Sequence, residues 1–270
     1  MNKKLIIINL ALILILLNLT IVAAQSQELE NNKVDELAGR KITAIEVKGN
    51  KVINDQQVLK EVTTQVASKI SPQQLQKDLQ SIFDLGYFFD VQVIFEEYNS
   101  GIKLIFEVIE NPEITEIKIT GNNNIDKAKI KEVLGVKLPE VLNVSQLNQG
   151  MKEVNQYYRE QGYILASITD VTIKNEDQLH LTINEGFINE IKIQGNDKTK
   201  KYVITREMDT QEGEVLNVEQ LRNDVTNIYR LGYFKSIIPK FNRLEDSHKV
   251  NVIIKVEEQK TGNFNIGVGY

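Results

Sequence analysis

Ile45-Glu46-Val47-Lys48-Gly49-Asn50 is the stretch that decides the fold, because the chain repeats its pattern twice more. Residues 117–122 read Ile-Lys-Ile-Thr-Gly-Asn, and residues 191–196 read Ile-Lys-Ile-Gln-Gly-Asn. A Gly-Tyr pair follows each copy, beginning at Gly86, Gly162 and Gly232. A fixed internal period is typical of one structural unit repeated in tandem. The sequence therefore predicts three small domains, over residues 41–111, 112–186 and 187–259.

The order within each repeat is expected to be strand, helix, helix, strand, strand. The second helix begins with a capping pattern in every copy, Ser71 with Gln74, Asn143 with Gln146 and Asn217 with Gln220. Apolar residues at helical spacing predict a core-facing stripe in the first and third copies, formed by Leu75, Leu79, Ile82 and Phe83, and by Leu221, Val225, Ile228 and Tyr229. The glycine of each Gly-Tyr pair predicts the helix end. Alternating strands follow, so the helices should cover one sheet face only.

The first of the two final strands is expected at a sheet edge. Its copy in the third repeat contains Pro239, and proline has no N–H for a ladder hydrogen bond. An open edge can accept an extended segment of another protein as an added strand. A neighbouring repeat or a loop could instead cover each edge. The residues expected to form client-binding edges are Val91, Val93, Phe95, Ile168, Val171, Ile237, Ile238 and Phe241.

The two ends of the chain differ in character from the repeats. Lys3 and Lys4 precede an apolar run, residues 5–22, that ends in small residues, which predicts a secretory signal peptide over residues 1–24. An uncleaved membrane anchor is the alternative, because the run is nearly long enough to cross a bilayer. Residues 25–40 read as a polar linker. The final segment, 260–270, alternates as a membrane barrel strand does, with one side formed by Phe264, Ile266, Val268 and Tyr270.

Composition excludes several functional classes. The chain carries 32 Lys and Arg against 37 Asp and Glu, a formal charge of −5, and removal of the two signal-peptide lysines would make it more acidic. Nucleic acid is therefore not an expected partner, because phosphate binding needs a basic surface. The absence of cysteine excludes disulfides and thiol chemistry. With two histidines and no catalytic constellation, the sequence predicts neither an enzyme nor a metal or cofactor.

Three modules with I-x-[IV]-x-G-N and G-Y signatures, followed by the alternating tail, resemble POTRA (polypeptide-transport-associated) domains of BamA-type outer-membrane protein assembly factors. The resemblance implies an α+β chain of three tandem POTRA domains, each a β-α-α-β-β unit with a mixed three-stranded sheet and two helices on one face, followed by the first part of a transmembrane β-barrel strand. It also implies export to the periplasmic side of the outer membrane. The implied partners are unfolded outer-membrane β-barrel proteins, accessory lipoproteins and, through a barrel, the membrane itself.

A finer resemblance concerns the third repeat. Arg206-Glu207-Met208 followed by Glu212-Gly213 is similar to the barrel-proximal POTRA of that family, in which the acidic residue couples to an accessory lipoprotein. Glu212, with Arg206 and Glu207, is therefore the expected partner site, and a solvated turn is the alternative. Other proteins with the same architecture also fit: TamA-like proteins, two-partner-secretion transporters, or a division-type POTRA protein anchored in the inner membrane.

Overall fold

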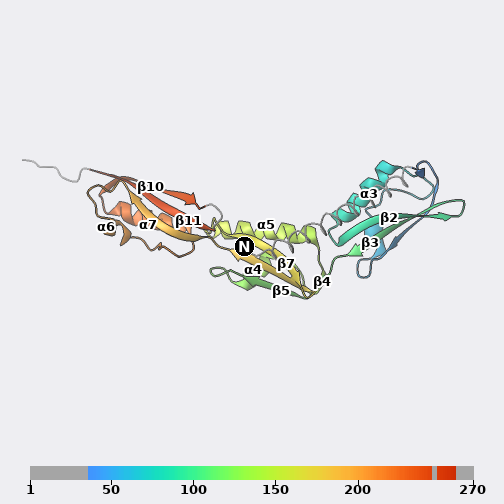
Figure 1. Ribbon diagram of the computed structural model, residues 1–270, viewed down its shortest axis with the longest axis horizontal. Coiled ribbons are helices and arrows are strands. Elements are labelled where there is room, and N and C mark those ends of the chain that lie inside the picture. The colour runs from blue at the N-terminus through green and yellow to red at the C-terminus, as the bar shows by residue number, and fades with distance from the viewer. Residues whose placement is uncertain (1–35, 245–247, 260–270) are drawn as a thin grey trace, which may run out of the picture. The chain divides into compact units, whose positions relative to one another are not determined.

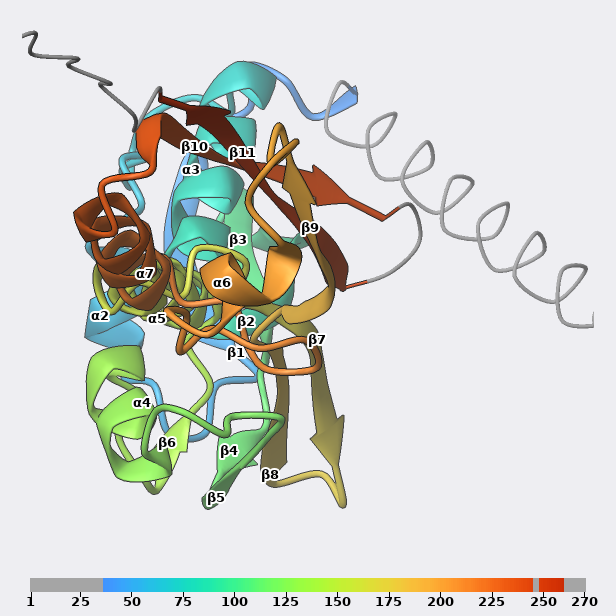
Figure 2. The same cartoon turned by 90° about the vertical axis from the view of Figure 1, so that its left-hand side faces the viewer.

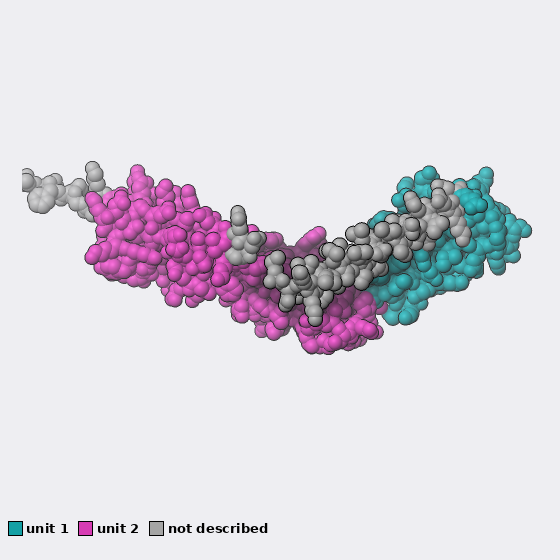
Figure 3. All heavy atoms as spheres, in the orientation of Figure 1, with its two compact units in different colours: residues 1–111 teal, residues 112–270 magenta. Residues whose placement is uncertain are grey.

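The computed structural model describes residues 36–244 and 248–259. The predicted signal peptide, most of the predicted linker and the predicted barrel strand lie outside these described residues. Contacts divide the chain into two compact units, Met1–Asn111 and Pro112–Tyr270 (Figure 3). The first unit holds the first repeat, and the second unit holds the second and third repeats.

The first unit has the predicted order of elements. They are β1 (Ile42–Lys48), α2 (Asp55–Leu59), α3 (Pro72–Asp84), β2 (Phe88–Tyr98) and β3 (Gly101–Glu110). The last strand lies in the centre of the sheet, in the order β1-β3-β2. It pairs in parallel with β1 and antiparallel with β2, which makes the sheet mixed.

The second unit repeats this plan twice (Figure 1). The second repeat consists of β4 (Glu113–Ile114), β5 (Glu116–Thr120), α4 (Lys127–Leu134), β6 (Glu140–Val141), α5 (Val144–Glu160), β7 (Ser167–Lys174) and β8 (Gln178–Asn184). The third consists of β9 (Phe187–Gln194), α6 (Lys201–Thr205), α7 (Val218–Arg230), β10 (Phe234–Arg243) and β11 (Lys249–Glu258). Their sheets have the orders β5-β8-β7 and β10-β11-β9, so the α+β fold with mixed three-stranded sheets is confirmed.

The helices of each repeat cover one sheet face, as α6 and α7 do on the β10-β11-β9 sheet (Figure 2). The N-cap predictions are confirmed, because Ser71, Asn143 and Asn217 each accept a hydrogen bond from a backbone N–H in the first turn. The prediction that Phe83 and Tyr229 lie in the core is wrong, because the two side chains are 50% and 57% exposed. Both lie at the margin of the apolar stripe, where the helix surface already turns toward solvent.

The Gly-Asn signature has a packing cause. Gly121 adopts a φ of +80°, and a Cβ there would lie 2.0 Å from the carbonyl oxygen of Ile183 in the central strand. Only glycine lets the backbone turn this close to β8. The side-chain amide of Asn122 then donates to the carbonyl of Ile125, at 3.0 Å, and closes the turn. The same geometry recurs at Gly49-Asn50 and Gly195-Asn196.

A carboxylate at the end of each central strand holds this turn, and the sequence analysis missed it. Glu185, fully buried, accepts hydrogen bonds from the backbone N–H groups of Asn123 and Asn124 and from the hydroxyl of Tyr158. Its counterparts Glu110 and Glu258 accept from the turns after β1 and β9. Burial and the neighbouring carboxylate of Glu185 raise the pKa of the Tyr158 hydroxyl far above its ordinary value.

The second and third repeats contact each other through residues next to the second Gly-Tyr pair. Leu165 packs against the apolar core of the third repeat. The N–H of Val218 donates to the carbonyl of Gly162 at 3.0 Å, and the side-chain amide of Asn217 donates to the carbonyl of Gln161 at 3.0 Å. The helix cap of α7 therefore also binds the end of α5, which accounts for the grouping of these two repeats in one unit.

Candidate functional site: the outer edges of the sheets

One edge of each sheet is partly occupied by the repeat's own interhelical loop. In the first repeat, the N–H of Ile42 donates to Ser68 and the N–H of Ala67 donates back to Ile42, both at 2.8 Å. In the second, β4 directly precedes β5 and pairs with β6 of the interhelical loop as a separate two-stranded sheet. In the third, Ile188 exchanges hydrogen bonds of 2.8 Å with Gly213 and Glu214. The beginning of the first strand is therefore closed to an incoming segment.

The opposite edge is formed by β2, β7 and β10, which is where the sequence analysis expected it. Each of these strands pairs with the central strand on one side, and within residues 36–244 and 248–259 no other strand pairs with its outer side. Each also contains an irregularity near its start, where one extra residue interrupts the register with the central strand. Irregularities of this kind are typical of sheet edges.

The predicted edge residues lie on two faces of their strands. Val91, Val93 and Phe95 pair with the buried residues of β3, so their side chains face the helices rather than an outer partner. Ile237 likewise packs against the core of the third repeat. Ile238 is 50% exposed, on the opposite sheet face. Recognition along these edges would therefore use mainly the outward backbone groups.

Pro239 shows which backbone groups of β10 point outward. The register between β10 and β11 continues through Pro239 without interruption. Because proline cannot donate a hydrogen bond, we infer that its nitrogen faces away from β11. Backbone groups of an antiparallel strand point alternately toward and away from the partner strand. The N–H groups of Ile237 and Phe241 then point outward, and those of Ile238 and Lys240 point toward β11.

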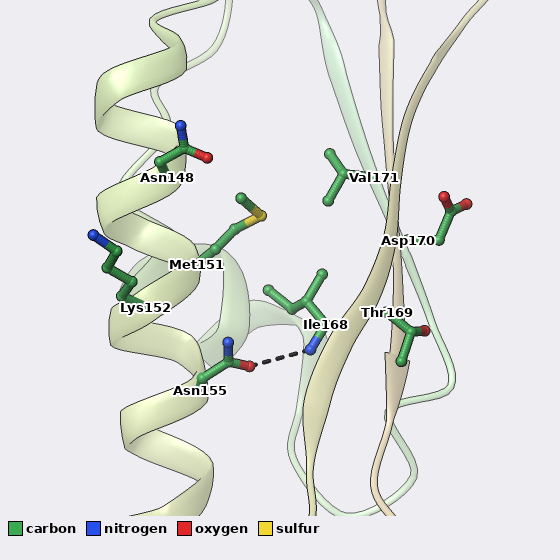
Figure 4. Close-up of a pocket in the computed structure, with 8 residues that line it drawn as sticks. All are labelled: Asn148, Met151, Lys152, Asn155, Ile168, Thr169, Asp170 and Val171. Carbon is green, nitrogen blue, oxygen red and sulfur yellow. Dashed lines mark hydrogen bonds between the residues drawn. The ribbon is translucent and has the colours of Figure 1, made fainter. Parts of the chain in front are cut away.

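A groove lies between α5 and the edge strand β7 (Figure 4). Its volume is roughly 600 Å³. Met151 reaches from the helix toward Ile168 and Val171 of the strand, which gives the groove an apolar floor, whereas Asp170 points away (Figure 4). The predicted edge residues Ile168 and Val171 thus line one groove together. A side chain of a strand added to β7 could enter it.

The side-chain oxygen of Asn155 accepts a hydrogen bond of 3.1 Å from the backbone N–H of Ile168 (Figure 4). Asn155 is not among the residues predicted from the sequence. In the sequence, Asn155 is distinguished only by its position. The equivalent position in the apolar stripe of the other two repeats holds an aromatic residue.

The predicted partner site in the third repeat is divided by the structure. Glu212 lies in an exposed turn beside Gly213, and its carboxylate accepts a hydrogen bond of 2.8 Å from the N–H of Ile191 in β9. Arg206 pairs with Glu207 at 3.0 Å. Glu212 and Arg206 line different hollows of the surface. The Glu212–Gly213 turn is therefore exposed, and the hydrogen bond from Ile191 holds the Glu212 carboxylate on β9.

The loop between α6 and α7 is held by a second buried carboxylate that was not predicted from the sequence. Asp224 on α7 is fully buried and accepts the backbone N–H groups of Asp209 and Thr210 at 2.9 and 3.1 Å. Asp78 on α3 holds the corresponding loop of the first repeat in the same way. Both helices share a Leu-x-x-Asp pattern near their beginning, and this pattern could have indicated the two buried aspartates.

Two further observations concern membranes and metals. No helix among the described residues is both long and apolar enough to cross a membrane. Within the same residues, His, Asp and Glu side chains form no cluster that could hold a metal ion.

The chain is similar to several curated proteins. An outer membrane protein assembly factor BamA of Nitratidesulfovibrio vulgaris is 32% identical over 165 residues, which cover 58% of this chain and 21% of that protein. Outer envelope protein 80, chloroplastic, of Arabidopsis thaliana is 26% identical over 213 residues, which cover 75% of this chain and 29% of that protein. The chain thus spans between a fifth and a third of the length of these relatives. Neither relative is named as an enzyme.

Two solved structures and a family model complete the comparison. The N-terminal domain of Omp85 from Thermosynechococcus elongatus matches with a TM-score of 0.74 at 26% identity, covering 82% of this chain and 98% of that one. POTRA1-3 of Omp85 from Anabaena shares the fold, with a TM-score of 0.66 at 24% identity, covering 82% of this chain and 96% of that one. The model described as POTRA, surface antigen variable number repeat, matches residues 40–111, 112–186 and 187–259. With three matched modules over most of its length, the chain belongs to the POTRA family.

Proposed function

We propose that this chain is the POTRA region of an outer-membrane protein assembly factor. It binds unfolded outer-membrane β-barrel proteins by adding a client strand to β2, β7 or β10, and it passes them to a barrel for insertion. The observation that carries the proposal is the asymmetry of the three sheets. One edge is partly closed near the repeat's own interhelical loop, and the other has no neighbouring strand among the residues that the structure describes. The similarity to assembly factors supports the same assignment.

The energy of strand addition suits transfer better than storage. A client that adds four or five backbone hydrogen bonds gains about 0.5 to 1.5 kcal/mol for each, and ordering the client segment offsets part of that gain. The resulting affinity is weak and tolerant of client sequence, because the outward backbone groups are the same for every client. Such contacts release a client readily to the next site.

The proposal extends to the two ends of the chain. Residues 1–24 act as a signal peptide that exports the protein to the periplasmic side of the outer membrane of a diderm bacterium. Phe264, Ile266, Val268 and Tyr270 begin the first strand of the barrel.

We also propose that Glu212 contributes to the binding of an accessory lipoprotein. Its turn is exposed, while the hydrogen bond from Ile191 holds the carboxylate in one place. A fixed, exposed carboxylate suits a cationic side chain of a partner.

Client binding can be tested at Phe241, whose N–H points outward from β10. A photoreactive amino acid at Asn242 reports contact with a urea-denatured outer-membrane β-barrel protein diluted into buffer. We expect Phe241→Pro to lower crosslinking several-fold, because it removes an outward donor without breaking the β10–β11 ladder. Phe241→Val is the matched control, since it removes the ring and keeps the N–H. Equal crosslinking by both variants, with unchanged circular dichroism, would reject strand addition at β10.

A further inference from the structure

The three repeats differ at one position of the second helix. Twelve residues after its N-cap, the second helix carries Phe83 in the first repeat, Asn155 in the second and Tyr229 in the third. The two aromatic side chains are 50% and 57% exposed. Asn155 is half-buried and faces β7. An amide oxygen accepts a backbone N–H strongly, whereas an aromatic ring does so only weakly.

Asn155 occupies a backbone donor at the beginning of the β7 edge. The N–H of Ile168 donates to the Asn155 oxygen at 3.1 Å. Ile168 is paired with Ile183 of β8, whose carbonyl lies against Gly121 on the β5 side of the sheet, so this pair exchanges no ladder bond and the Ile168 amide points outward. The irregularity of β7 falls immediately after it, at Thr169, between the paired residues Ile168 and Asp170. The edge of the second repeat is thus divided into an occupied part at Ile168 and an outer part over residues 170–174.

We propose that Asn155 is a gate that limits how far a client strand can pair along β7. This inference rests on the proposed function, since it assumes that clients add to this edge. A client that reaches Ile168 must displace the Asn155 amide, and it then exchanges one acceptor for another with no net gain of a hydrogen bond. A client that pairs only with residues 170–174 leaves the gate closed.

The groove indicates which class of client segment fits the outer part of the β7 edge. Met151, Ile168 and Val171 provide an apolar floor, and Lys152 lies at the rim on the helix side (Figure 4). A short extended segment with one apolar side chain directed into the groove, and polar neighbours, matches this surface. The second repeat therefore selects short alternating segments, whereas the helices of the first and third repeats carry an exposed aromatic residue at the position of Asn155.

The test uses the full chain and a fluorescein-labelled nine-residue peptide of alternating valine and threonine with a lysine at each end. Fluorescence anisotropy gives the affinity, and hydrogen exchange gives the protection of the Ile168 amide in the free protein. We expect Asn155→Ala to remove that protection and to tighten peptide binding by about two- to tenfold, the equivalent of one added hydrogen bond. Asn155→Asp keeps an acceptor at the same place and should preserve both the protection and the wild-type affinity.

Gln149→Ala is the matched control on the same helix, because Gln149 hydrogen-bonds to Glu153 rather than to the strand. It should change neither readout. If the peptide binds the wild type and Asn155→Ala equally well, the gate is overturned and strand addition stands. If the peptide binds neither protein, strand addition at β7 fails and the gate fails with it. Unchanged protection of Ile168 in Asn155→Ala would overturn the gate independently of any peptide.

Discussion

Replacing Asp224 with alanine tests whether one buried carboxylate holds the loop that precedes α7. The carboxylate is fully buried and accepts the N–H groups of Asp209 and Thr210 at 2.9 and 3.1 Å. Alanine leaves both amides without this acceptor. The Thr210 amide is buried and its loss costs about 1 to 3 kcal/mol, whereas the Asp209 amide is only partly buried and costs less. The third repeat should therefore lose about 2 to 4 kcal/mol, a large part of the stability of a small domain. Asp224→Asn keeps one acceptor oxygen and should lose about half as much.

Hydrogen exchange with mass spectrometry can resolve this effect within the third repeat, where global unfolding would average over both compact units. We expect peptides from the 206–216 loop and from α7 to exchange at least about tenfold faster in Asp224→Ala, since 1.4 kcal/mol corresponds to a factor of ten. Asp209→Ala is the control, because that side chain is exposed. If Asp224→Ala exchanged within twofold of this control, the buried carboxylate would not be what holds the loop.

Two further predictions concern other carboxylates. Burial by itself would raise the pKa of Asp78, but hydrogen bonds from Thr64, Thr63 and Gln74 outweigh it and hold that pKa below its ordinary value of 3.8. The carboxylate therefore stabilises the first unit above about pH 4, and this stability is lost as the pH falls through the lowered pKa. Urea unfolding between pH 6 and 2 should show this loss of stability. Asp78→Asn should make the loss smaller. At Glu212, alanine should expose the Ile191 amide to exchange while glutamine protects it, and both should weaken binding of a purified accessory lipoprotein. Retained binding by Glu212→Gln would argue against a role for its charge.

Much of the fold could be predicted from local patterns. The helix caps, the glycine ends and the alternating strands each depend on residues within a few positions of one another, and the structure contains all of them. The error at Phe83 and Tyr229 has the same origin. The apolar stripe of a helix shows in which direction a side chain points. Whether a side chain at the margin of the stripe is buried depends on how far the neighbouring strand extends.

The candidate site was harder to predict, because its members are far apart in the chain. The hydrogen bond between Asn155 and Ile168 requires α5 and β7 to lie side by side, and Glu185 reaches a turn some sixty residues earlier. A polar residue in an amphipathic helix reads as solvent-exposed until its partner strand is known. Asp78, Asp224 and Asn155 were overlooked for this reason.

The sequence by itself determined that the chain contains three copies of one α+β module, because period, caps and strand alternation are local consequences of backbone geometry. Tertiary structure alone decided which sheet edge each interhelical loop closes, and that Leu165 and Asn217 join two of the copies into one unit. It also decided that β7 carries an occupied donor. These outcomes depend on which surfaces meet after folding, and on the cost of burying backbone groups without partners, and neither is written in a short stretch of residues.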